Sequence, residues 1–322
     1  MMIVRLPRFG IAQVRLELAR GLVMVEFSSA AASAKLSASI EAAPRQILEI
    51  ADLERLFPAG TRVYLPEIRN VPMTVQVEAA RRLSRAGLIP VPHVAVRRVE
   101  SRGALAQRLA RLARDGGASE ALVIAGDVDQ PAGPFSSSME ALATGIFADQ
   151  GFSTLAVAGH PTGFAHADEE GLLSALSWKN EFAARTGTNM RIVTQFGFDP
   201  RRVVAWTRRL ERSGNRLPIH VGLAGPAKIG TLLKYAGLCG VGASMSVLRQ
   251  NADAYAVLAT SYSAEAVLGP IDAYIRSEPV SSIAMAHIYP FGGLRRTADW
   301  LVSRGTWPLP VEAPAAASDG GI

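Results

Sequence analysis

The sequence predicts a (β/α)8 TIM barrel, an α/β fold in which eight parallel strands close into a ring surrounded by helices. One unit recurs along the chain, in which an arginine-rich amphipathic helix, a Gly or Pro turn and a short apolar run follow one another. Eight such apolar runs are present, and most begin roughly 27 to 40 residues apart, the spacing of βα units. Eight alternating units favour a closed barrel over an open doubly wound sheet.

The clearest copy of the unit has leucines at helical spacing, Leu105, Leu109 and Leu112, followed by a Gly-Gly break. The run Leu122–Gly126 comes next and is continuously apolar, as expected of a strand buried on both faces. The eight expected strands are Leu22–Phe27, Arg62–Leu65, Ile89–Val96, Leu122–Gly126, Ser153–Gly159, Arg191–Phe196, Ile219–Leu223 and Ser282–Ile288.

The last gap between expected strands is longer than the others. It contains Leu233–Cys239 and Asn251–Arg276, which we expect to be extra helices before the last strand. Residues 1–307 are expected to form one barrel domain, opening with a leading segment and a helix over residues 1–20. The stretch 308–322 is rich in Pro, Ala and Gly, so we expect a disordered C-terminal tail.

Composition excludes several classes of function. The net charge is +6 and the pI is about 9.8, but the arginines are scattered as pairs, so we expect no nucleic-acid partner. The lone Cys239 excludes an internal disulfide and is typical of a reducing compartment. No signal peptide and no long apolar run is evident, which predicts a cytoplasmic protein without a membrane partner. The histidines lack metal-binding spacing, so no metal is expected.

Polar residues stand where the expected strands end. In a parallel barrel, side chains from several strands converge at the carboxyl ends, and catalysis takes place there. The residues in question are Glu26, His93, Asp127, His160, Gln195 and His287.

Three of these residues carry specific expectations. Glu26 lies in an apolar segment, which suits a general acid, although a salt-bridged residue at the barrel rim would look the same. Asp127 follows Gly126, which would let a flat ligand approach the backbone, although Asp127 could equally cap the next turn. Gln195 can donate and accept at once, which matches the edge of a pterin or flavin.

The strand-end segments resemble the methylenetetrahydrofolate reductase family, and they do so in order along nearly the whole chain. The most specific segment is Ile192–Asp199 (IVTQFGFD), which is close to the family's Ile-Thr-Gln-Phe-Phe-Phe-Asp. The other similar segments are Val25–Phe27, Ala125–Gly133, Val157–Pro161, Ile219–Leu223 and His287–Phe291.

The resemblance implies that hydride moves from NADH or NADPH through bound FAD to the methylene group of a folate. Glu26 would protonate the folate, Asp127 would hold the pterin near the flavin, and Gln195 would pair with the pterin edge. Ile229 and Arg295 would complete the folate site. The implied FAD contacts are Tyr64, His93, Ala125, Gly126, Asp127, Ser138, His160 and Lys179.

The sequence departs from the family pattern mainly on the flavin side. Ala125 replaces an arginine, His160 replaces a tyrosine, and Ile229 stands where an aromatic residue is usual. A reductase that transfers hydride without flavin is therefore an alternative, as are the reverse oxidation and a non-catalytic barrel that binds folate or flavin. The extra helices would be compatible with a homo-oligomer.

Overall fold

The computed structural model describes residues 35–164, 167–238, 261–278 and 280–309. The chain divides into two compact units, Met1–Lys35 and Leu36–Ile322, and the second unit holds the barrel. The predicted leading helix within residues 1–20 lies outside the described residues. So does most of the predicted tail, of which Pro308 and Leu309 alone are described.

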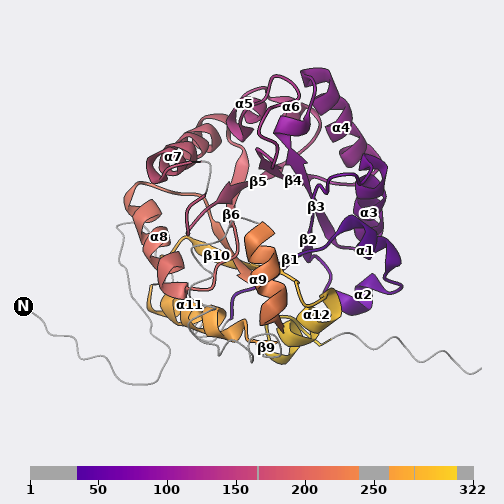
Figure 1. The fold of residues 1–322 in the computed structure, drawn as a ribbon. Helices are drawn as coiled ribbons and strands as arrows, with labels where there is room; N and C mark the ends of the chain where they lie inside the picture. The colour runs from indigo at the N-terminus through magenta and orange to yellow at the C-terminus, as the bar shows by residue number, and fades with distance from the viewer. Residues whose placement is uncertain (1–34, 165–166, 239–260, 279, 310–322) are drawn as a thin grey trace, which may run out of the picture. The chain divides into compact units, whose positions relative to one another are not determined.

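The predicted barrel is confirmed. Eight parallel strands close into a ring in the order β1-β10-β7-β6-β5-β4-β3-β2, with helices around the outside (Figure 1). The strands are β1 (Ala38–Glu41), β2 (Arg62–Leu65), β3 (Ile89–Ala95), β4 (Glu120–Ile124), β5 (Thr154–Gly159), β6 (Asn189–Thr194), β7 (Ile219–Ala224) and β10 (Ile283–Tyr289). Two short strands, β8 (Ala227–Lys228) and β9 (Ser261–Tyr262), pair separately as an antiparallel ribbon.

The prediction of Leu22–Phe27 as the first strand of the barrel is wrong. β1 takes that place, pairing Ile40 with Val63 of β2 and Ala38 with Ala286 of β10. The ring is closed without Leu22–Phe27, which lies outside the described residues. β1 has only four residues, and Ser39 and Glu41 alternate with its apolar positions, so it contains no continuous apolar run. The first barrel strand begins at Ala38, and the domain bounds of 1–307 stay a prediction.

Helices follow the strands and bury their apolar stripes against them. The three leucines predicted to form the inner face of one helix, Leu105, Leu109 and Leu112, are fully buried on α4. The helices are α1 (Pro44–Glu49), α2 (Leu53–Leu56), α3 (Met73–Arg85), α4 (Arg102–Arg114), α5 (Ser138–Leu142), α6 (Ile146–Asp149), α7 (Glu169–Thr186), α8 (Pro200–Arg212), α9 (Ile229–Leu238), α11 (Glu265–Ser277) and α12 (Leu294–Ser303). Within the described ranges, none of the helices is long and apolar enough to span a bilayer.

The extra helices expected before the last strand are present in part. α9 starts at Ile229, before the expected Leu233, and α11 covers the second half of the expected 251–276 helix. α9 follows the carboxyl end of β7 within a few residues, so the insertion starts on the mouth side of the barrel, where the strands end.

The interior of the barrel contains a paired set of charges. Arg191 of β6 lies 2.5 Å from a carboxylate oxygen of Glu120 on β4, and its Nε donates to the hydroxyl of Tyr64 on β2 at 2.8 Å. Arg62 approaches the same carboxylate at 3.0 Å. A buried charge is tolerated when it is paired and hydrogen-bonded, so this network forms a stable polar layer inside the barrel.

Candidate active site

A carboxylate and two histidines from three strands meet at the barrel mouth. Oε2 of Glu41, the last residue of β1, lies 3.6 Å from Nε2 of His93 on β3 and 4.0 Å from Nε2 of His287 on β10. Both distances exceed hydrogen-bond length. The side chain of Glu41 is 22% exposed, whereas both histidines are buried. The Glu41 carboxylate is therefore half-buried beside two imidazole rings and remains partly open to solvent.

The two histidines are neutral at physiological pH. Burial lowers the pKa of His93 and of His287, and the nearby Glu41 carboxylate offsets that effect only in part. Nδ1 of His287 lies 3.0 Å from the hydroxyl of Ser39, which orients the ring. Nε2 of each histidine is buried without a hydrogen-bond partner in the described part of the chain.

Tyr64 supports this cluster from inside the barrel. Its ring meets the His287 ring edge-on at a centroid distance of 4.4 Å, and its hydroxyl accepts the hydrogen bond from Arg191. The Tyr64 side chain has no exposed surface. The predicted contact between Tyr64 and a cofactor does not fit this burial, and the residue links the polar layer below to the histidine above.

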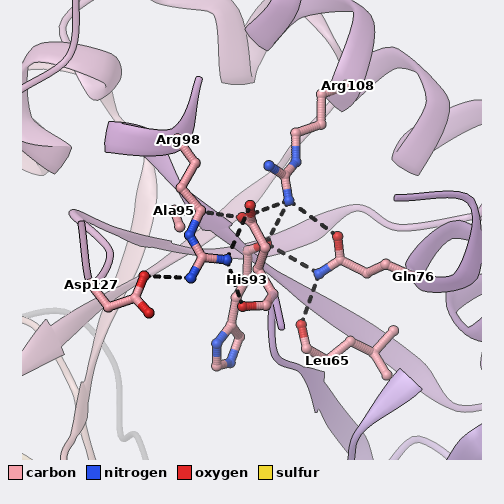
Figure 2. A network of polar contacts seen from close by, with 8 residues as sticks. Leu65, Gln76, His93, Ala95, Arg98, Arg108 and Asp127 are labelled. Carbon is pink, nitrogen blue, oxygen red and sulfur yellow. Dashed lines mark hydrogen bonds and ion pairs between the residues drawn. The ribbon is translucent and has the colours of Figure 1, made fainter. Parts of the chain in front are cut away.

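The segment after β4 brings a second carboxylate to the mouth. Asp127 is largely exposed and forms an ion pair with Arg98, from the turn after β3 (Figure 2). Burial alone would raise the pKa of Asp127, but the hydrogen bond and the charge of Arg98 outweigh it and hold that pKa below its usual range. Gly126 has φ +100°, and a Cβ there would lie 3.0 Å from Cβ of Ala95, so glycine is required.

Gln195 directly follows β6. Its side-chain Oε1 accepts a hydrogen bond from the backbone N–H of Phe196 at 3.0 Å, which leaves its amide nitrogen to donate. Next to it, aromatic rings pack together: Phe196 and Phe291 at 4.8 Å, and Tyr235 stacked on Phe291 at 4.6 Å. This wall is suited to packing against a flat ligand.

A buried lysine lies on the other side of the mouth. Lys179 of α7 is 6% exposed and has no hydrogen-bond or ion-pair partner among the residues that the structure describes. Burial lowers its pKa to about 8. Burial and the charge of Lys179 lower the pKa of His160, after β5, to about 4. A buried ammonium group without a counter-ion suits an anionic ligand.

The sequence-predicted residues are only partly brought together. Asp127 and Gln195 each contact a neighbour of their own, Arg98 and Phe196, while Lys179 and His160 lie close enough to influence one another. Glu26 lies outside the described residues. Of the remaining predicted residues, Ala125 accepts a backbone hydrogen bond from Arg97. Ser138 and Ile229 are buried at the starts of α5 and α9, and Arg295 is exposed on α12.

Sequence reasoning missed Glu41. The available signal was the alternation Ser39-Ile40-Glu41 followed by Pro44, which starts a helix. In the described part of the chain, no group of three or more His, Cys, Asp or Glu side chains has the arrangement of a metal site.

Comparisons with known proteins support the fold. No family model matches the chain. A Clostridium thermocellum protein that binds two copies of 5-methyl-5,6,7,8-tetrahydrofolic acid is similar, with 11% identity, coverage of 80% of this chain and 90% of that one, and a TM-score of 0.50.

Two further solved structures have lower scores. Dihydropteroate synthase from Thermus thermophilus has 14% identity, coverage of 84% and 92%, and a TM-score of 0.44. A xylose isomerase domain-containing protein from Salmonella typhimurium has 16% identity, coverage of 84% and 96%, and a TM-score of 0.43. At these identities the likeness extends to the barrel fold alone.

Proposed function

We propose that this barrel is a methylenetetrahydrofolate reductase, which transfers hydride from NADH or NADPH to the methylene group of 5,10-methylenetetrahydrofolate, or catalyses the reverse oxidation. The observation that carries the proposal is the position of Glu41 at the end of the first strand, between two neutral histidines. Pro44 follows Glu41 at the spacing of the first proline in the family's Glu-Phe-Phe-Pro-Pro motif, which the 25–27 segment lacks.

Glu41 takes the role that the resemblance gave to Glu26. In the proposed reaction, its carboxyl group donates a proton to N10 of the folate, the bond from N10 to the methylene carbon breaks, and an iminium forms at N5. Hydride then adds to the methylene carbon and gives 5-methyltetrahydrofolate. The neutral imidazoles form no hydrogen-bonded ion pair with Glu41, so its carboxyl group is left to interact with the substrate.

Asp127 and Gln195 are suited to hold the pterin. Arg98 keeps Asp127 ionised at neutral pH, so its carboxylate can accept hydrogen bonds from the N–H groups of the ring. Gln195 has its oxygen engaged by Phe196 and its amide nitrogen available to donate to a ring acceptor. The aromatic wall around Phe291 would pack against the rest of the ligand.

The residues present fit an FAD cofactor, which when bound would carry hydride between the nicotinamide and the folate. The ammonium of Lys179, which has no partner among the described residues, fits a diphosphate group. Ser138 and His160 lie on neighbouring segments of the same side. Because Ala125 carries no charge, Lys179 would supply the main cationic contact to the phosphates.

The proposal is tested by purifying the full chain, recording its absorbance spectrum, and adding NADH or NADPH with and without 5,10-methylenetetrahydrofolate. We expect a flavin spectrum that is bleached by the nicotinamide and restored by the folate. A colourless protein that still oxidises the nicotinamide only when the folate is present would indicate direct transfer without flavin. A protein with no folate-dependent oxidation in either case would contradict the proposed activity.

A further inference from the structure

Ser39 lies two residues before Glu41 on β1, and its side chain is fully buried. Its hydroxyl donates to the backbone oxygen of Ala286 at 3.3 Å, and the same oxygen atom of Ser39 lies 3.0 Å from Nδ1 of His287. A hydroxyl has one proton to donate, whereas it can accept through two lone pairs. With its proton directed to the carbonyl oxygen, the Ser39 hydroxyl accepts from His287, and Nδ1 is then the ring nitrogen that carries the proton.

The His287 ring is held in one orientation. It has no exposed surface, and it meets the rings of Tyr64 and Tyr289 edge-on at centroid distances of 4.4 and 4.8 Å. A ring packed in this way cannot exchange the positions of its two nitrogens without displacing these neighbours. Nδ1 therefore stays beside Ser39, and Nε2 stays on the side of Glu41, 4.0 Å from Oε2.

A neutral imidazole with its proton on Nδ1 presents a lone pair at Nε2. Nε2 of His287 is buried and has no hydrogen-bond partner among the described residues, so this lone pair is available to a donor. The ionised carboxylate of Glu41 can only accept, whereas its protonated form can donate to Nε2 after a movement of about 1 Å. The tautomer therefore favours the protonated form of Glu41, which is the form that a general acid needs.

Further titratable side chains face Glu41 and His287 from the neighbouring strands. They are Tyr64 of β2, His93 of β3, Arg191 of β6, His220 of β7 and, beside His93, Glu67 with its partner Arg108. Burial lowers the pKa of both of these histidines and raises the pKa of the tyrosine, so they stay neutral near pH 7, while the arginine stays charged. The protonation of Glu41 is therefore left to respond to the tautomer of His287.

We propose that Ser39 is a positioning residue, which fixes His287 as the Nδ1–H tautomer so that Nε2 accepts the proton of Glu41 until that proton is transferred. The tautomer depends on the contacts of Ser39 alone, whereas its role in proton transfer rests on the proposed function. In each turnover the Glu41 proton passes to N10 of the folate and leaves a carboxylate. A proton from solvent then restores the carboxyl group, and His287 keeps its Nδ1 proton throughout.

The tautomer can be measured directly in the full-length wild-type protein. Long-range ¹H–¹⁵N correlation spectra show which ring nitrogen of a histidine carries the proton, and the chain has only five histidines. The signals of His287 are identified by their loss in His287→Asn. We expect a protonated Nδ1 and an unprotonated Nε2 near neutral pH. A protonated Nε2, in a neutral or a charged ring, would overturn the proposal.

The functional test compares Ser39→Ala with Ser37→Ala, an exposed serine of the same segment, as the matched control. Without the Ser39 hydroxyl, the ring takes the Nε2–H tautomer, whose proton stabilises the Glu41 carboxylate. In rapid mixing, we expect the pH at which folate reduction is half-maximal to fall by about one unit, and the rate above that pH to fall about 10-fold. Reduction of the flavin by NADH or NADPH should not change, and Ser39→Thr should restore the wild-type pH profile.

The outcomes separate this inference from the proposed function. If Glu41→Gln slows folate reduction but Ser39→Ala keeps the wild-type pH profile, the proposal for Ser39 fails while the proposed function stands. The same holds if Ser39→Ala lowers the rate equally at every pH, or if Ser37→Ala gives the same shift. If the wild-type protein does not reduce the folate, or if Glu41→Gln has no effect, the proposed function fails and the role of Ser39 in proton transfer fails with it.

Discussion

Two kinds of buried cation can be compared in this barrel. Arg191 lies inside it, hydrogen-bonded to Glu120 and to Tyr64, and the charge and hydrogen bonds of these partners raise its pKa against the opposing effect of burial. Lys179 is as deeply buried but has no partner among the described residues, and burial lowers its pKa to about 8. A buried cation that is fully hydrogen-bonded and paired is compatible with a stable fold. A buried cation without such partners lowers the free energy of unfolding and favours the binding of an anion.

Breaking the Arg191 network should have the largest effect. Glu120→Ala removes the carboxylate and leaves the guanidinium buried without its counter-ion, so the free energy of unfolding should fall by about 3–5 kcal/mol. Urea denaturation measures it, with Glu54→Ala, an exposed position on α2, as the control. A loss no greater than that of Glu54→Ala would show that the pair is not structural.

Lys179 should make the free energy of unfolding depend on pH, because its buried charge destabilises the folded protein. Its pKa is about 8 in the folded protein and 10.5 ordinarily, so between these values the unfolded chain binds more protons. The stability of wild-type protein should therefore rise as pH increases from about 8 to 10.5, by up to about 3 kcal/mol from this group.

Lys179→Met should abolish that rise and increase stability near neutral pH, because it removes the buried charge. Denaturation of both proteins across this pH range, taken as a difference, isolates the contribution of Lys179. Added pyrophosphate should stabilise wild-type protein more than the variant. Identical pH dependence in the two proteins would mean that Lys179 has a partner or reaches solvent.

Tyr64 should show the smallest of these effects. Tyr64→Phe keeps the ring against His287 but removes the hydroxyl that accepts from Arg191, leaving Nε of the guanidinium without that partner. The loss of stability should be about 1–2 kcal/mol in urea denaturation. Tyr64→Leu, which also removes the ring, should cost more, and equal losses for both variants would show that the hydroxyl contributes little.

Most of the barrel could be predicted from the sequence because its strands are buried on both faces. The runs at 122–126, 191–196 and 219–223 correspond to β4, β6 and β7. β1 could not be found in this way, since its interior positions are the polar Ser39 and Glu41. The longer apolar run at 22–27 predicts the first strand instead, and with it a catalytic acid at Glu26.

The sequence predicts which polar residues of the candidate site follow the strands, but it does not predict which residues they contact. Asp127, His160 and Gln195 lie just after β4, β5 and β6, as expected from the apolar runs before them. Their partners are set by tertiary packing. Arg98 and Asp127 are 29 positions apart, and Glu41 meets His287 from the opposite end of the chain. No periodic pattern in one sequence reports such contacts.

The central claim is that Glu41 is the acid at the folate site, and rapid-mixing kinetics of its Gln variant test this most directly. Glu41→Gln should slow folate reduction by about 10²- to 10⁴-fold and leave reduction of the flavin by NADH or NADPH largely intact. Glu49→Gln, exposed on α1, should change neither step. Normal folate reduction by Glu41→Gln, together with slowed folate reduction by Glu26→Gln, would contradict the role of Glu41 as the acid. An equal loss of folate reduction and of flavin reduction in Glu41→Gln would contradict it as well.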